Sequence, residues 1–173
     1  MSLSGKRVLL LVEDGYEDLE FWYPKIRLAE EGAEVVVAGM SETKTYGSKH
    51  GYPAKPDVRV GDIDPKDFDA VVIPGGVRCP DLLRRHKKVL NLVKAMNDRG
   101  KIVAAICHAA WVPISAGIVK GKRMTCYFSV KDDVKNAGAR YVDSPVVKDA
   151  NLVTSRHPGD LPRFCSAIID ALS

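Results

Sequence analysis

The dipeptide Cys107-His108 combines a thiol with an imidazole, the pair that nucleophilic catalysis by cysteine uses. It follows the apolar run 101–106 and precedes residues 109–112, where a helical pattern begins. A strand, a sharp turn and a helix in this order form a nucleophile elbow, which pushes the side chain at the turn out of the sheet. The helix N-terminus is expected to lower the pKa of the Cys107 thiol and favour the thiolate. A buried, inert cysteine stays open as the alternative, because this residue type is commonly buried.

Other candidate residues follow the apolar runs that come earlier in the chain. Ligands of an open parallel sheet bind beyond the carboxyl ends of its strands, so these positions should converge on one cleft. Glu17 is either a carboxylate at a helix start or a carboxyl group hydrogen-bonded to the Cys107 sulfur. Gly75 and Gly76 are either a tight turn or part of an oxyanion hole that includes the N–H of His108. The remaining candidates are Glu13, Asp14 and Pro74.

Four apolar runs and the helical patterns between them must position these residues. The runs are continuous rather than alternating, which indicates strands buried on both faces of a parallel sheet; they are Val8 to Val12, Val35 to Ala38, Ala70 to Ile73 and Ile102 to Ile106. Helices are predicted at 17–31, 81–99, 109–117 and 129–138. Gly32 and Gly100 close the first two, because helices commonly end on a left-handed glycine. Ser129 and Asp132 resemble a capping box at the start of the last.

The pattern changes toward the end of the chain. Two short apolar runs, Val146 to Lys148 and Leu152 to Ser155, flank a predicted turn at 149–151 and indicate a hairpin. A final helix is predicted at 161–172, and the glycine- and proline-containing stretch 40–69 is expected to be extended or hairpin structure over the sheet edge. We therefore predict one α/β domain over residues 1–173 with a mostly parallel sheet. Residues 1–4 play no part in this prediction.

Composition limits the partners and the location. The 173 residues are 46% apolar and 28% charged, which is typical of a globular domain. The net charge of +4 is too weak to predict a nucleic-acid partner. Because no apolar run is long enough to cross a bilayer and the N-terminus lacks a signal-type stretch, we expect a cytoplasmic protein without a membrane partner. The wide spacing of Cys79, Cys107, Cys126 and Cys165 predicts reduced thiols, no metal and no cofactor.

Taken together, these motifs resemble the PfpI family of intracellular cysteine proteases and their glyoxalase and deglycase relatives, within the class I glutamine amidotransferase-like superfamily. The resemblance covers essentially the whole chain. Its carriers are residues 15–20, 23–24, 69–76, 105–108, 131–133, 136–138 and 154–156, followed by Pro158 and residues 160–161.

The resemblance implies a flavodoxin-like three-layer sandwich in which Cys107 is the nucleophile, His108 its partner and Glu17 the carboxylate near the sulfur. It also implies that Tyr127 lines the pocket. In the proteases of this family, a glutamate after the Gly-Gly turn completes the triad from a neighbouring subunit, which implies a homo-oligomer, a dimer or a hexamer. Here the turn is one residue longer and Asp81 stands at the glutamate position. This departure favours carbonyl chemistry over peptide hydrolysis.

We predict a cysteine-dependent enzyme that acts on a small carbonyl substrate or a peptide, as an intracellular peptidase or as a glyoxalase or deglycase on methylglyoxal-type dicarbonyls. Thiolate attack with proton transfer by His108 or Glu17 serves both reactions. A glutamine amidotransferase is less favoured, because the late His157 is followed by Pro158 and Gly159 instead of forming a His-x-Glu pair. A non-catalytic, redox-responsive stress protein remains an alternative, since an accessible thiolate oxidises readily.

Overall fold

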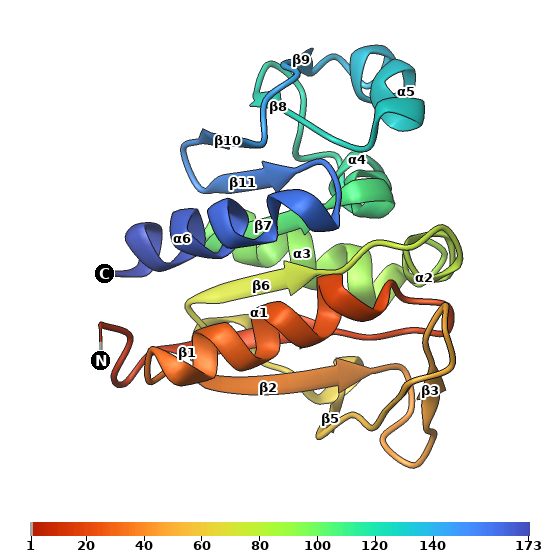
Figure 1. Ribbon diagram of the computed structural model, residues 1–173, viewed down its shortest axis with the longest axis vertical. Coiled ribbons are helices and arrows are strands. Elements are labelled where there is room, and N and C mark those ends of the chain that lie inside the picture. Colours follow the sequence, from red (N-terminus) through yellow and green to blue (C-terminus); the bar gives the residue numbers. More distant parts are fainter. Residues whose placement is uncertain (1) are drawn as a thin grey trace.

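A seven-stranded sheet forms the middle layer of the computed structural model, which describes residues 2–173 (Figure 1). Its strands are β1 (Arg7–Leu11), β2 (Glu34–Gly39), β5 (Val58–Arg59), β6 (Ala70–Ile73), β7 (Ile102–Ile106), β10 (Val146–Asp149) and β11 (Leu152–Ser155). They lie in the order β10-β11-β7-β6-β1-β2-β5, and every neighbouring pair is parallel except β10 with β11. The predicted flavodoxin-like sandwich with a mostly parallel sheet is confirmed.

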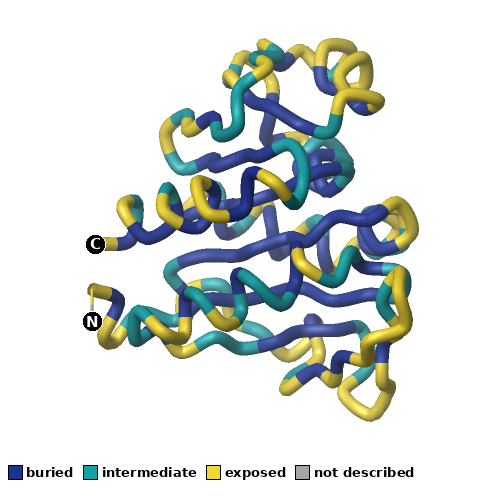
Figure 2. The backbone as a smooth tube through the Cα atoms, viewed as in Figure 1, coloured by how far each residue is buried: buried dark blue, intermediate teal, exposed yellow. Residues whose placement is uncertain are grey.

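Helices cover both faces of the sheet, which explains the continuous apolar runs. Helices α1 (Asp18–Glu30) and α6 (Leu161–Leu172) lie on one face and α3 (Lys87–Asp98) lies on the other (Figure 1). Every residue of β6 and β7 is buried. Figure 2 shows these central strands as a buried band, whereas the helices expose their outer sides. No helix among residues 2–173 is both long enough and apolar enough to cross a membrane.

The helix predicted at 81–99 is interrupted and forms two helices, α2 (Arg78–Leu83) and α3. The break falls at His86, whose backbone is extended with φ −94° and ψ 110°. Leu83 and Val89 on either side of the break are both fully buried. On one continuous helix these two side chains, six residues apart, would point about 120° away from each other. The break allows both to enter the core.

The two short predicted helices begin as 3-10 turns. Residues Cys107–Ala110 lead into α4 (Trp111–Ser115), and residues Phe128–Val130 lead into α5 (Lys131–Asn136). The predicted capping box of Ser129 and Asp132 is wrong, because no side chain caps the start of the 3-10 turn Phe128–Val130 or the start of α5. Ser129 lies inside the 3-10 turn, and its hydroxyl is 3.4 Å from Nε2 of His108.

The stretch 40–69 and the C-terminal third complete the fold. A small hairpin of β3 (Tyr46–Gly47) and β4 (Pro53–Ala54) lies beside the sheet, whose edge strand is β5, in agreement with the predicted edge structure. The other elements are the parallel pair β8 (Arg123–Met124) and β9 (Arg140–Tyr141) and the 3-10 turns Val60–Asp62, Pro65–Asp67 and Pro158–Asp160. Leu3, near the N-terminus, is fully buried and contributes to the core.

The predicted β10–β11 hairpin is present, with Asp149 opposite Leu152 and Ala150 in the left-handed region at φ 51°.

We expect Ala150→Gly to raise the free energy of unfolding by about 0.5–1 kcal/mol. Relief of the left-handed conformation, roughly 1–2 kcal/mol, exceeds the entropic cost of glycine of about 0.5–1 kcal/mol. Urea denaturation measures the change. Ala167→Gly inside α6 is the control and should lower stability by about 1 kcal/mol; equal losses in both variants would contradict the expectation.

Candidate active site

The elbow places Cys107 at the carboxyl end of β7 in a strained backbone conformation. Its φ is 64°, a left-handed value that costs an L-residue roughly 1–2 kcal/mol. The strand that leads into it is held by parallel pairing with β6 on one side and β11 on the other. Cys107 is 6% exposed and lines a pocket of about 780 Å³. Such strain at a pocket is characteristic of functional positions, where the surroundings fix the conformation.

His108 faces the thiol even though the two residues are adjacent in sequence. Its Nδ1 lies 3.1 Å from Sγ of Cys107, and its Nε2 lies near the hydroxyl of Ser129. The imidazole stacks on the ring of Tyr127 at a centroid distance of 4.8 Å. Burial, together with the positive charge of Lys49, lowers the pKa of His108. The imidazole is therefore mainly neutral at neutral pH and can accept the thiol proton.

The carboxyl group beside the sulfur belongs to Glu20, which is fully buried at the base of the pocket. Its Oε2 accepts the backbone N–H of Gly75 at 2.9 Å. Its Oε1 is buried without a hydrogen-bond partner, and the Cys107 thiol and the N–H of Gly76 are the other polar groups that act on this carboxyl. Burial, and next the negative charge of Glu17, raise the pKa of Glu20 to about 8. At neutral pH this group is mostly protonated and can donate a hydrogen bond to the sulfur.

The prediction that Glu17 is the carboxyl group beside the sulfur is wrong, because Glu20 takes this place. Glu17 lines the pocket, but it is the N-cap of α1, and its Oε2 accepts the N–H of Glu20 at 2.9 Å. The helical period supplies a signal that could have identified the right residue. Glu20 is buried on the same stripe of α1 as Pro24 and Leu28, at successive intervals of four residues.

Both glycines of the Gly-Gly turn are required by close contacts. A Cβ at Gly75 would overlap Oε2 of Glu20 and lie 2.6 Å from Cβ of Cys107, and Gly76 has a left-handed φ of 82°. The N–H of Gly75 is already bonded to Glu20, so it is not free for the predicted oxyanion hole. The N–H groups that approach the Cys107 sulfur belong to His108 and Gly76.

The thiol does not have the lowered pKa that the elbow predicted. Burial, and next the charge of Glu20, raise the pKa of Cys107, whereas the N–H groups of His108 and Gly76 act in the opposite direction. The short 3-10 turn that begins at Cys107 does not outweigh the loss of solvation. Because the carboxyl and the thiol interact directly, they titrate as a pair that shares protons.

Several other candidates lie outside the pocket lining. Asp81 is exposed on α2, and within residues 2–173 it forms no hydrogen bond or ion pair with His108. Glu13 is buried, with its Oε1 accepting the N–H of Asp14, and Lys44 lies near both carboxylates. Besides Glu20, the lining residues not predicted from the sequence are Gly15, Ser48, Lys49, Val77, Arg78 and Pro158.

One group of potential metal ligands lies at the pocket edge. Glu17, Asp18 and His50 bring their ligand atoms within 4.8 Å of one another. Hydrogen bonds already account for this arrangement, because Asp18 accepts from Ser48 and from the backbone of His50, and Glu17 accepts from a helix N–H. Nothing further in the cluster points to a bound cation.

Comparison with known proteins identifies similar chains over almost the full length. Residues 6–171 match the DJ-1/PfpI family. The deglycase TK1284 of Thermococcus kodakarensis is 49% identical over 90% of this chain and 92% of its own, and the deglycase PfpI of Pyrococcus furiosus is 44% identical over the same shares. The crystal structure of DJ-1beta from Drosophila melanogaster superposes with a TM-score of 0.91 at 33% identity, covering 96% of this chain and 90% of that one.

The Glu20 carboxyl gives a prediction about the reactivity of Cys107. At pH 7 we expect Cys107 to be alkylated before the other three cysteines, and we expect Glu20→Gln to slow its alkylation about tenfold. An amide donates a weaker hydrogen bond to the thiolate than a carboxyl group does, and tenfold corresponds to about one pKa unit. Iodoacetamide labelling followed by peptide mass mapping, at a series of pH values, provides the measurement.

The pH dependence and a comparison variant make this prediction specific. In the unmodified protein the rate should rise with pH as the pair of carboxyl and thiol loses its first proton. Glu20→Gln should move the rise to higher pH, because it leaves the buried thiol as the only group of the pair that can lose a proton. Glu17→Gln should have a smaller effect, since Glu17 bonds the helix N-terminus. Faster alkylation of Glu20→Gln would show that the carboxyl only repels the thiolate, and earlier labelling of Cys79, Cys126 or Cys165 would contradict the choice of nucleophile.

Proposed function

Since the chain belongs to the DJ-1/PfpI family, we propose that it is an enzyme that uses the Cys107 thiolate to attack small reactive carbonyl compounds of the methylglyoxal type. The observation that carries the proposal is the strained elbow, which holds the Cys107 sulfur 3.1 Å from Nδ1 of His108 inside a pocket. The names of the deglycase relatives support it and extend it to glycated substrates.

The residues of the pocket can perform this chemistry without an added oxidant or reductant. Neutral His108 accepts the thiol proton while the sulfur adds to the aldehyde carbon, and it returns the proton to the new oxygen. The N–H groups of Gly76 and His108 lie at the sulfur and can donate to that oxygen. Removal of the C–H proton of this adduct gives an enediol. Return of that proton to the neighbouring carbon, with the hydroxyl proton moving to the neighbouring oxygen, gives a thioester of a 2-hydroxy acid. Water cleaves the thioester, so the overall reaction adds one water to the dicarbonyl.

Peptide hydrolysis is less well supported by the geometry. It needs a well-oriented histidine to protonate a poor leaving group, and the residue that would orient it, Asp81, lies outside the pocket lining of its own chain. The Nε2 of His108 is directed instead at the hydroxyl of Ser129, which carries no charge. A peptide must also be held along a cleft before its amide reaches the sulfur, which a two-carbonyl substrate does not require.

We therefore expect kcat/KM for methylglyoxal to exceed that for short fluorogenic peptides by about 10³-fold or more. Both activities are measured on one preparation, with Cys107→Ser as the inactive control. Asp81→Glu should raise peptide cleavage more than methylglyoxal turnover, because the longer side chain extends the reach of the carboxylate. Peptide cleavage above dicarbonyl turnover would refute the ranking. Oxidation of Cys107 without turnover of either substrate would favour the redox-responsive alternative.

We also propose that the protein is a homo-oligomer whose contact surface includes α2. Asp81 is exposed on this helix, and Val77 immediately before it is 59% exposed, so the segment offers an apolar contact and a carboxylate together. We expect light scattering at micromolar concentration to give at least a dimer, and Val77→Asp to shift the mass toward the monomer. A monomeric mass for the unmodified protein would refute this proposal and leave the carbonyl chemistry unaffected.

A further inference from the structure

Two cationic side chains lie at the rim of the active-site pocket without an ion-pair partner. Lys49 and Arg78 both line the cavity that holds Cys107 and His108, and both are exposed. Neither side chain forms a salt bridge or a hydrogen bond with another residue in the part of the chain that the structure describes. Lys44, by contrast, is bound to Asp14 at 2.7 Å. The charges of Lys49 and Arg78 therefore remain available to a molecule in the pocket.

The acidic side chains near the rim are engaged elsewhere. Asp14 is paired with Lys44, and Asp18 lies 2.8 Å from Nδ1 of His50. Of the two carboxyl groups in the lining, Glu20 is mostly protonated at neutral pH, because burial raises its pKa to about 8. Glu17 remains as the negative side chain of the lining, and it caps α1. The two cations outnumber it.

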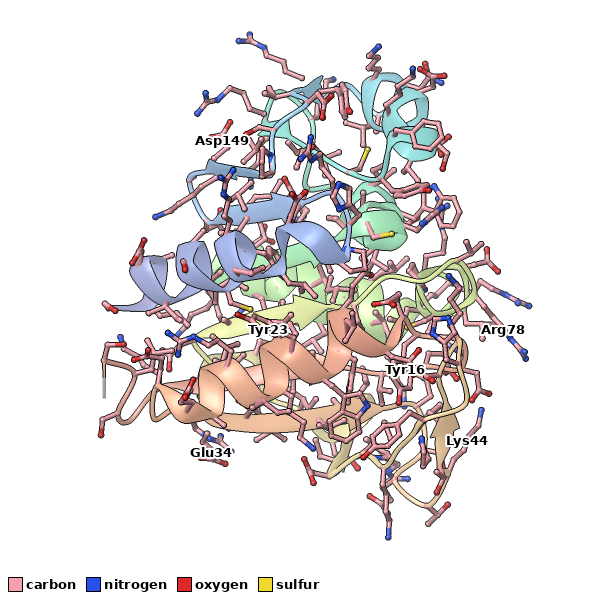
Figure 3. All side chains as sticks on the ribbon, in the orientation of Figure 1. Tyr16, Tyr23, Glu34, Lys44, Arg78 and Asp149 are labelled. Atoms are coloured by element: carbon pink, nitrogen blue, oxygen red, sulfur yellow. The ribbon has the colours of Figure 1, made fainter. Side chains whose placement is uncertain are left out.

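The fold fixes both cations to one segment of backbone, residues 15–16. The N–H of Lys49, in the β3–β4 hairpin, donates to the carbonyl oxygen of Tyr16 at 2.7 Å. Arg78 begins α2, and a Cβ at Gly15 would lie 2.7 Å from Cβ of Arg78, so only glycine allows this close approach. Arg78 and Lys44 lie at the same edge of the molecule, beyond the carboxyl ends of the strands, and the buried Tyr16 lies inward of them (Figure 3). The lengthened turn after Gly76 thus contributes a side chain to the pocket mouth.

We propose that Lys49 and Arg78 form an anion-binding rim that selects reactive carbonyl substrates with a carboxylate remote from the reacting carbon. This inference rests on the proposed function and specifies its substrate class. Arginine offers a planar fork that can bind both oxygens of a carboxylate, and lysine adds a mobile point charge. The reacting carbonyl lies at Cys107 while the carboxylate stays at the rim in contact with water, so its binding does not require complete desolvation. The reaction itself is unchanged, with one water added to each dicarbonyl.

A matched pair of substrates tests the rim. Phenylglyoxal and 4-carboxyphenylglyoxal differ by one carboxylate remote from the dicarbonyl, and we expect kcat/KM to favour the charged compound about tenfold at low salt. Arg78→Gln and Lys49→Gln should each reduce this ratio about threefold to fivefold, as expected for exposed ion pairs, and Arg78→Glu should reduce it further. Added salt should reduce the ratio in the unmodified protein because it screens exposed charges. Arg85→Gln, an equal charge change at an exposed position outside the pocket, should leave the ratio unchanged.

A second measurement separates the rim from the proposed function, because it needs no turnover. Iodoacetate and iodoacetamide alkylate the same thiol and differ in charge, so the ratio of their rate constants at Cys107 reports how strongly the pocket attracts an anion. Relative to a free model thiol, we expect this ratio to be raised in the unmodified protein and in Arg85→Gln, and lowered by Arg78→Gln and Lys49→Gln. If the ratio of the iodoacetate and iodoacetamide rate constants is the same in Arg78→Gln and Lys49→Gln as in the unmodified protein, the proposed anion-binding rim is refuted. A responsive alkylation ratio without turnover of either glyoxal would support the rim and refute the proposed function.

Discussion

The contact between the buried carboxyl group of Glu20 and the thiol of Cys107 is the constraint on which the site depends. An isolated carboxylate in this position would be costly, because burial removes its hydration. The cost falls when the carboxyl keeps its proton, and burial raises the pKa of Glu20 accordingly. A protonated carboxyl group can donate a hydrogen bond to a thiolate, and this hydrogen bond makes the thiolate less costly to bury. Once the pair has lost its first proton, the remaining proton is shared between the two groups and stabilises both.

This contact determines what the surrounding elements must do. Gly75 cannot carry a side chain, because a Cβ would overlap Glu20 and crowd Cys107, and its N–H fixes the carboxyl. Glu17 must cap α1 so that Glu20 enters the pocket from the first turn of the helix. Strands β6 and β7, whose residues are all buried, hold the turn and the elbow next to each other through parallel pairing. The left-handed backbone of Cys107 is tolerated at the end of these strands, where the neighbouring structure leaves little freedom to relax.

The sequence predicted the features that depend on local pattern and missed those that depend on tertiary contacts. Continuous apolar runs identified the central strands, and the change from strand to helix pattern located the elbow at Cys107. The sequence predicted Glu17 instead of Glu20 because both residues lie at the start of the same helix. Only packing against the sheet shows which of the two is buried. Ser129 fits a helix cap by local pattern, but the 3-10 turn directs its hydroxyl to His108. The sign of the pKa shift at Cys107 likewise depends on burial, which short sequence motifs do not report.

The arrangement of charge separates the chemistry of the site from its selectivity. At the base of the pocket, Glu20 and His108 are mainly neutral at neutral pH, because burial shifts the pKa of each toward its uncharged form. A charge that develops on the sulfur or on a substrate oxygen there interacts strongly with nearby dipoles, since the local dielectric response is weak. At the rim, Lys49 and Arg78 act through water, where attraction is weaker and salt screens it. A substitution at the base should therefore change the reactivity of the thiol, whereas one at Arg78 should change which molecules reach it. Lys49 acts on both, because its positive charge also lowers the pKa of His108.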